Sequence, residues 1–243
     1  MVDDLSPTFR DSKLASVAEI ALVFVVAFAV IFVGWNIVGD DTFARQAVVW
    51  VANVLMMVTV WMGLRLRGQT WGHFGLNFSF GGKRVLRRTV LLSLAVLVAA
   101  IAGFMIGSIV AANLMTIPEG ADMSGYNYLQ GNLPMLLLAL AGVYVVSSFG
   151  EEVIYRGFLI NRIAEICGSG KAAWRIAVVI SAVVFGLVHF SWGLFGVVQT
   201  MFMGLALAIA YLVVDRKLWV LILAHAYMDT VLLVQVYLGM PDA

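Results

Sequence analysis

Long runs without a charged side chain dominate this sequence and decide what it can fold into. Asp, Glu, Lys and Arg are absent from residues 46–64, 89–118, 123–150 and 176–214. A transmembrane helix needs about 20 mostly apolar residues, so the last run is long enough for two helices, divided by a turn near 190–193. Only 12% of the residues are charged, against about 25% in soluble domains. These runs exclude an ordinary soluble domain.

Two further runs, each with a single charge, complete the set of expected spans. The charge between Lys13 and Asp40 is Glu19, and the charge within 218–241 is Asp229. We therefore predict an all-α, polytopic membrane helical bundle of about seven transmembrane helices (six to eight), forming a single integral membrane domain over 1–243. The expected spans are 15–38, 44–64, 89–117, 134–158, 174–190, 193–214 and 218–238.

The loop charges predict an orientation. The 65–88 loop holds six Lys and Arg residues and no acidic residue, so the positive-inside rule places it in the cytoplasm. Alternation then predicts a cytoplasmic N-terminus, an outside C-terminus and outside loops at 39–43 and 118–133, where acidic residues lie. We expect a protein of the plasma membrane in contact with lipid. The net charge of +1 favours no nucleic-acid partner.

A few ionisable side chains fall within the expected spans, where lipid should exclude them: Glu151, Glu152, Arg156, His189, His225 and Asp229. An unpaired charged residue at mid-span costs about 2.5–3.5 kcal/mol, so such residues usually mark function. Counting about 1.5 Å of rise per residue from the basic end of each helix brings three helices' polar groups to a similar depth. The sequence therefore predicts one polar site inside the membrane.

Four-residue spacings on a helix indicate which side chains share a face. Glu152 and Arg156 are expected to form an ion pair, with Glu151 facing elsewhere. His225 and Asp229 are expected to point at one site. Phe185 lies one turn before His189 and is expected to form an aromatic wall beside it.

Other polar or small residues are expected to be structural. Glu19 is interpreted as an interfacial side chain and His73 as a surface residue. Gly103 and Gly107 form a GxxxG step that favours helix packing within the chain over a dimer contact.

Two histidines and a carboxylate in a water-poor site suit hydrolysis. A carboxylate such as Glu151 can take a proton from a water that is also held by His189, while His225 stabilises the oxyanion formed at a carbonyl. Alternatively, the two histidines and either Glu151 or Asp229 ligate a catalytic Zn²⁺ with an open position for water. The zincin spacing H-E-x-x-H is absent, so the sequence allows a metal without requiring one. Ser147 and its neighbour lie outside any G-x-S-x-G motif, which makes a serine nucleophile less attractive.

Three motifs, in this order on successive apolar segments, resemble one family. They are E-E-x-x-x-R, F-x-x-x-H and H-x-x-x-N/D, here Glu151-Glu152-Val-Ile-Tyr-Arg156, Phe185-Gly-Leu-Val-His189 and His225-Ala-Tyr-Met-Asp229. Together they resemble the CPBP family of CAAX prenyl endopeptidases, bacteriocin-processing enzymes and abortive-infection (Abi) membrane proteins. The similarity covers about residues 130–240, which would carry the catalytic core. The resemblance implies an intramembrane endopeptidase acting on a peptide or protein substrate.

The family pattern also implies roles for the matched residues. Glu151 would be the general base, with His189 as its partner in activating water, while Glu152 and Arg156 support the site. His225 and the residue four later would bind the oxyanion or help to ligate zinc. That later residue is Asp229, where many members carry Asn, and an ionised Asp cannot donate a hydrogen bond to an oxyanion.

Two competing functions remain open from the sequence. One is a non-proteolytic membrane immunity or scaffold protein that keeps the polar cluster for structure. The other is a proton-coupled transporter that would use the intramembrane carboxylates as relays. The sequence shows neither an internal repeat nor a pair of interrupted apolar segments, which disfavours the transporter.

Overall fold

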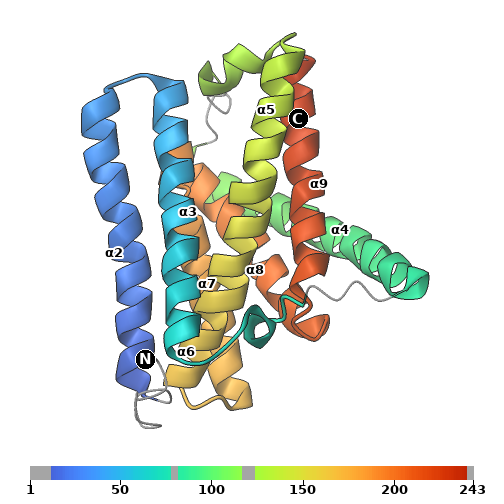
Figure 1. The fold of residues 1–243 in the computed structure, drawn as a ribbon. Helices are drawn as coiled ribbons and strands as arrows, with labels where there is room; N and C mark the ends of the chain where they lie inside the picture. The colour runs from blue at the N-terminus through green and yellow to red at the C-terminus, as the bar shows by residue number, and fades with distance from the viewer. Residues whose placement is uncertain (1–11, 78–81, 117–123, 240–243) are drawn as a thin grey trace.

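The chain folds into a helical bundle, and its described part contains no strand (Figure 1). The computed structural model describes residues 12–77, 82–116 and 124–239. The elements in chain order are α2 (Lys13–Val38), α3 (Thr42–Leu66), η1 (Trp71–Phe74), α4 (Lys83–Leu114), η2 (Ser124–Leu129), α5 (Leu133–Val143), η3 (Tyr144–Leu159), α6 (Ile160–Ile166), α7 (Lys171–Leu187), η4 (Phe190–Trp192), α8 (Gly193–Val213) and α9 (Leu218–Tyr237). Here η3 is a π-helix, and the other η elements are 3₁₀-helices.

Six helical segments within the described residues are long and apolar enough to cross a membrane. Helices α5, η3 and α6 run on without a break and count as one segment of 34 residues, Leu133–Ile166. Helix α7 has 17 residues and is shorter than the other spans. With α7, seven helical segments form the bundle, so the predicted polytopic helical membrane domain is confirmed.

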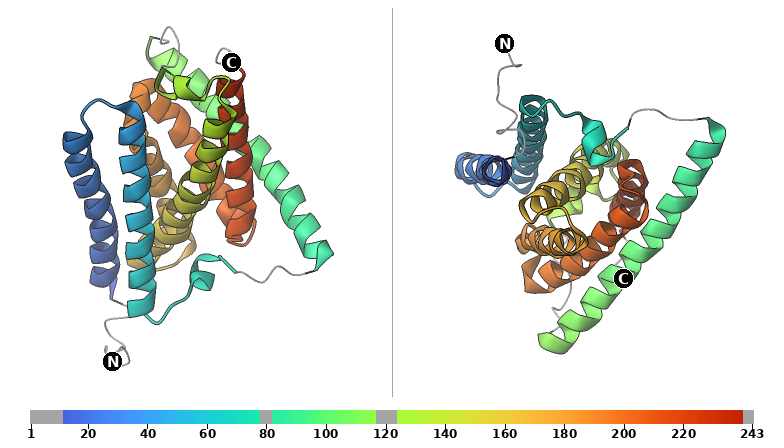
Figure 2. Two further views of the ribbon diagram at one scale, coloured as in Figure 1. Left: turned by 45° about the horizontal axis from the view of Figure 1, so that its top comes forward. Right: turned by 90° about the horizontal axis from the view of Figure 1, so that it is seen from below.

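The α2–α3 pair and α4 lie on opposite sides of the bundle (Figure 2). Helix α2 buries only four residues along its length, at Ala15, Ser16, Val23 and Ala27. Many of its other apolar side chains, such as Phe28 and Ile37, are exposed on the outer surface. In a protein within a membrane, this outward apolar surface faces lipid rather than water.

Helix α4 packs along α8 through the GxxxG step. A Cβ at Gly103 would lie 2.8 Å from the carbonyl oxygen of Phe202, and one at Gly107 would lie 2.8 Å from the Cα of Gln199. Only residues without a side chain allow such a close approach of two helices. The prediction that this motif packs helices within the chain is confirmed.

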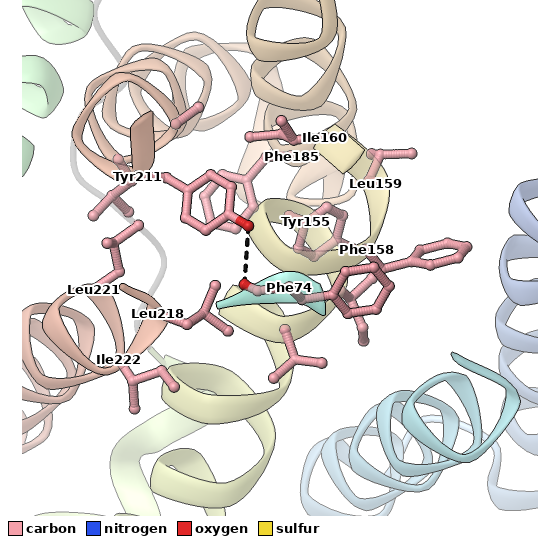
Figure 3. Packing of buried hydrophobic residues seen from close by; sticks show 14 of the residues in the cluster. Phe74, Tyr155, Phe158, Leu159, Ile160, Phe185, Tyr211, Leu218, Leu221 and Ile222 are labelled. Atoms are coloured by element: carbon pink, nitrogen blue, oxygen red, sulfur yellow. Dashed lines mark hydrogen bonds between the residues drawn. The ribbon is translucent and has the colours of Figure 1, made fainter. Parts of the chain in front are cut away.

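A buried aromatic cluster holds the connection after α3 beneath the centre of the bundle (Figure 3). Phe74 of η1 is fully buried, and the hydroxyl of Tyr211 donates a hydrogen bond of 2.9 Å to its carbonyl oxygen. The next residue, Gly75, has φ +80°, and a Cβ there would collide with the carbonyl oxygen of Arg216. Glycine is therefore required where this loop crosses the turn between α8 and α9.

Helix α2 begins and α9 ends at opposite ends of the bundle, as Figure 1 shows. This arrangement agrees with an odd number of helical crossings. Which of the two ends faces the cytoplasm stays a prediction from the loop charges. The outside connection expected around Glu119 and Asp122 lies outside the described residues.

Candidate functional site

The candidate site is built on the π-helix η3, where the sequence predicts ordinary α-helical spacing. A π-helix closes its hydrogen bonds from residue i to i+5 and so has more residues per turn than an α-helix. Segments of this kind are rare and are frequently found at functional sites. The wider turn presents two pairs of neighbours to α9, the serines at 147–148 and the glutamates at 151–152. The expectation that Glu151 faces elsewhere is wrong, since both glutamates lie toward His225.

Glu152 lies at the bottom of the site and holds two partners. Its Oε1 accepts hydrogen bonds of 2.8 Å from both Arg156 and His225 Nδ1, and its side chain is fully buried. A carboxylate only accepts hydrogen bonds, so Nδ1 of the ring carries a proton and Nε2 faces the rest of the site. The predicted pairing of Glu152 with Arg156 is confirmed, and it extends to the histidine of α9.

Two further carboxylates approach the exposed side of the same ring. The distance from His225 Nε2 to Glu151 Oε2 is 4.0 Å, and the distance to Asp229 Oδ1 is 3.9 Å. Both carboxylates are partly exposed, at 19% and 15% of the side-chain surface, whereas the ring is almost fully buried. Both distances exceed a direct hydrogen bond, so neither carboxylate is hydrogen-bonded to Nε2.

His189 lies near this cluster, and the ring of Phe185 packs against both histidine rings. Its Nδ1 contacts the carbonyl oxygen of Phe185 at 2.7 Å, so Nδ1 donates and Nε2 is free to accept. The ring of Phe185 has its centroid 4.8 Å from that of His189 and 6.5 Å from that of His225. The guanidinium of Arg156 also stacks over Phe185, 4.1 Å from the ring centroid. The predicted aromatic wall is thus present, and it packs against both histidines.

Two serines that the sequence gives no role join the site. Ser148 Oγ donates a hydrogen bond of 2.7 Å to Asp229 Oδ2, and Ser147 Oγ lies 3.4 Å from His225 Nε2. At α-helical spacing, each serine shares a face with the glutamate four positions later, but the two faces point in different directions and are not both expected to meet α9. A signal in the sequence is the i, i+4 repeat from 147–148 to 151–152, which places each serine one turn before a glutamate.

The short helix η2 packs against α9, the helix that carries Asp229. Tyr126 of η2 packs against a small cluster that includes Leu136 of α5 and Leu233 of α9. Burial raises the pKa of Tyr126, and the negative charges of Tyr128, Asp229 and Glu151 raise it further. The tyrosine is therefore in its neutral, hydrogen-bonding form near neutral pH.

The predicted zinc ligands do not converge in this arrangement. Within the described residues, no group of three or more His, Cys, Asp or Glu side chains is placed to hold a metal ion. His225 uses Nδ1 for Glu152, and His189 uses Nδ1 for the carbonyl oxygen of Phe185. We therefore derive no step through a metal, and zinc dependence stays a prediction.

A second polar cluster lies at the end of the bundle where α2 begins, and we call it the Glu19 network. Glu19 accepts hydrogen bonds from Arg67 and Arg162, and Arg162 also donates to both carboxylate oxygens of Glu165 at 2.9 and 3.0 Å. His73 Nε2 contacts Glu165 at 3.1 Å. Ser16 and Gln69 complete the network. Glu19 and His73 thus belong to a paired cluster that ties α2 to α3 and α6. The sequence predicts an interfacial side chain and a surface residue at these positions, but not that they join one network.

Comparison with known proteins identifies a family for the region that holds the site. The family model of type II CAAX prenyl endopeptidase Rce1-like proteins matches residues 133–231, which include all three motifs. The resemblance to the CPBP family drawn from those motifs is confirmed. No curated protein and no solved structure matches the chain.

Proposed function

We propose that this protein is an intramembrane endopeptidase in which Glu151 activates the water that attacks a peptide bond. The observation that carries the proposal is the gathering of two partly exposed carboxylates around one buried histidine in a membrane bundle. A protease of the CAAX type is the kind of enzyme that the family match supports.

The proposed reaction uses water as its nucleophile. Glu151 takes a proton from the water, whose oxygen bonds to the carbonyl carbon, and the electron pair of the C=O bond moves to the carbonyl oxygen. His189 accepts a hydrogen bond from the same water through Nε2, and His225 faces the resulting oxyanion. As the C–N bond breaks, Glu151 returns the proton to the leaving amine. The carbonyl re-forms as a carboxylic acid, and the acid and amine products then separate.

Glu152 and Arg156 support this chemistry without touching the substrate. Glu152 fixes the orientation of the His225 ring through Nδ1, and Arg156 balances the buried negative charge. Orientation of a ring by a buried carboxylate is the arrangement that keeps one tautomer in place in other hydrolases. The substrate is expected to be a peptide or protein segment at the membrane, with a CAAX-type C-terminus as the first class to test.

The test is cleavage of a defined peptide by the full-length protein in lipid nanodiscs. We would use a quenched fluorescent peptide that ends in a farnesylated CAAX box, and the same peptide with a free cysteine. Replacing Glu151 with Gln removes the base and is expected to lower kcat by about 10²–10⁴-fold. The matched Glu165→Gln variant, far from the site, should retain kcat in its folded fraction.

Three outcomes would redirect the proposal. Unchanged turnover in Glu151→Gln would refute the assignment of the base. Loss of turnover on chelation, restored by Zn²⁺, would favour the metal-assisted alternative, and stoichiometric zinc in the purified protein would support it. If wild-type protein cleaves neither peptide, and Glu151→Gln and His189→Ala both preserve the cellular phenotype, the non-proteolytic immunity or scaffold function would replace the protease.

A further inference from the structure

The proposed site needs a hydrogen-bond donor for the oxyanion beside His225, and Asp229 does not supply one. Asp229 stands beside His225, but as a carboxylate it offers only acceptor oxygens. Its Oδ2 already accepts the hydrogen bond of Ser148, at 2.7 Å. A second negative charge next to a developing oxyanion would raise the energy of the transition state rather than lower it.

Ser147 supplies the missing kind of group. Its Oγ lies 3.4 Å from His225 Nε2 and its side chain is partly buried, on the same face of η3 as Glu151. A hydroxyl can accept one hydrogen bond and donate its own proton at the same time, and its hydrogen rotates to suit the partner. When the ring of His225 carries a proton on Nε2 as well as on Nδ1, Ser147 can accept from Nε2 while donating to a carbonyl oxygen.

We propose that Ser147 is a catalytic residue that donates a hydrogen bond to the oxyanion beside His225, in place of the donor that Asp229 lacks. Ser148 is a positioning residue that holds the carboxylate of Asp229 by Oδ2. This inference rests on the proposed hydrolysis, because it assigns a further group to the same reaction. It adds no covalent step, since the nucleophile remains water and the serine oxygen stays unmodified.

The first experiment measures kcat and KM of Ser147→Ala with the two peptides named above. Loss of one oxyanion donor is expected to lower kcat by about 10²–10³-fold with KM changed by less than about threefold. Ser147→Thr keeps the hydroxyl and should retain most of the activity. Ser93→Ala is the matched control, because its hydroxyl donates to the carbonyl oxygen of Val90 in its own helix.

A second experiment introduces a hydrogen-bond donor at position 229 instead of position 147. Asp229→Asn places an amide next to His225, and its oxygen can still accept from Ser148 while its nitrogen donates. In the Ser147→Ala background this change should recover kcat by at least about tenfold. Recovery on this scale is not expected from a serine whose role is only to pack.

The results that overturn the inference are distinct from those that overturn the proposed function. Cleavage that needs Glu151 but persists in Ser147→Ala would remove Ser147 from the reaction and leave the proposed function standing. Absence of rescue by Asp229→Asn, in a protein that elutes as a folded species, would also contradict it. Covalent labelling of Ser147 by a fluorophosphonate would make it a nucleophile instead. Cleavage by Glu151→Gln, or no cleavage by the wild type, would overturn the proposed function and this inference with it.

Discussion

The molecule contains two buried clusters of carboxylates and arginines, and they differ in how many of their polar atoms have hydrogen-bond partners. In the Glu19 network, Arg162 donates to three different side chains, and the two glutamates share their oxygens among arginines, a histidine and a serine. In the candidate site, Glu152 Oε2 and Arg156 Nε are buried without a hydrogen-bond partner within the described residues. Glu151 there approaches its nearest charged partner only to 4.0 Å.

The difference separates a structural cluster from a functional one. Buried charges are stable when paired and hydrogen-bonded, so the Glu19 network is what a bundle needs where α2 has few other buried contacts. Polar atoms buried without partners cost free energy, so the candidate site is less stable than a fully paired cluster such as the Glu19 network. Mutations in the two clusters should therefore act on different quantities, stability in one and turnover in the other.

The largest expected effect is on stability, from Arg162→Met. Removing this fully buried guanidinium takes hydrogen bonds from the carboxylates of Glu19 and Glu165 and leaves Arg67 as their remaining arginine partner. Breaking one side of a buried ion pair costs roughly 3–5 kcal/mol. Unfolding in detergent, followed by circular dichroism, should show this loss, while kcat of the folded fraction stays within about threefold. Arg65→Met, at an exposed position near the same end, is the control and should change stability by less than about 0.5 kcal/mol.

A loss of kcat as large as the loss in Glu151→Gln would contradict the separation. It would mean that the Glu19 network acts on the site through α6 and η3. Unchanged stability in Arg162→Met would show that the network contributes little to folding.

A smaller effect, on turnover, is expected from Glu152→Gln. The amide no longer balances the charge of Arg156 and no longer holds His225 Nδ1 by a charge-assisted hydrogen bond. Loss of such an orienting partner typically lowers activity by about 10–100-fold. The measurement is kcat on the peptide that wild-type protein cleaves, with Glu165→Gln as the matched substitution in the other cluster. Equal losses of kcat in both variants would refute a special role for the site cluster.

Much of the fold could be predicted from the sequence because the membrane leaves few alternatives. Charge-free runs of about 20 residues have to be helices in lipid, since every backbone group must find its partner within the segment. The same reasoning identifies Glu151, His225 and Asp229, because their cost in lipid makes them conspicuous. The glycines at 103 and 107 also show their role, as their spacing is that of closely packed helices.

The details of the site could not be predicted because they depend on a local departure from helical geometry. No residue pattern in η3 predicts a π-helix. The sequence therefore does not predict that both glutamates lie toward His225, or that Ser147 lies beside them. The Glu19 network was missed for another reason. Its members come from α2, α3, η1 and α6, and only the folded chain brings Glu19 and Arg162 together across 143 positions.

The smallest effect should come from His73→Gln, at the edge of the Glu19 network. His73 reaches Glu165 at 3.1 Å, but its side chain is 35% exposed, and Arg162 already binds both oxygens of that glutamate. Exposed ion pairs contribute about 0–1 kcal/mol and are screened by salt, so the loss of stability should stay below about 1 kcal/mol and shrink further in high salt. Thermal unfolding at two salt concentrations measures both. A loss equal to that of Arg162→Met would show that the network depends on its exposed histidine as much as on its buried arginine. Burial would then not predict how much each residue of this cluster contributes to stability.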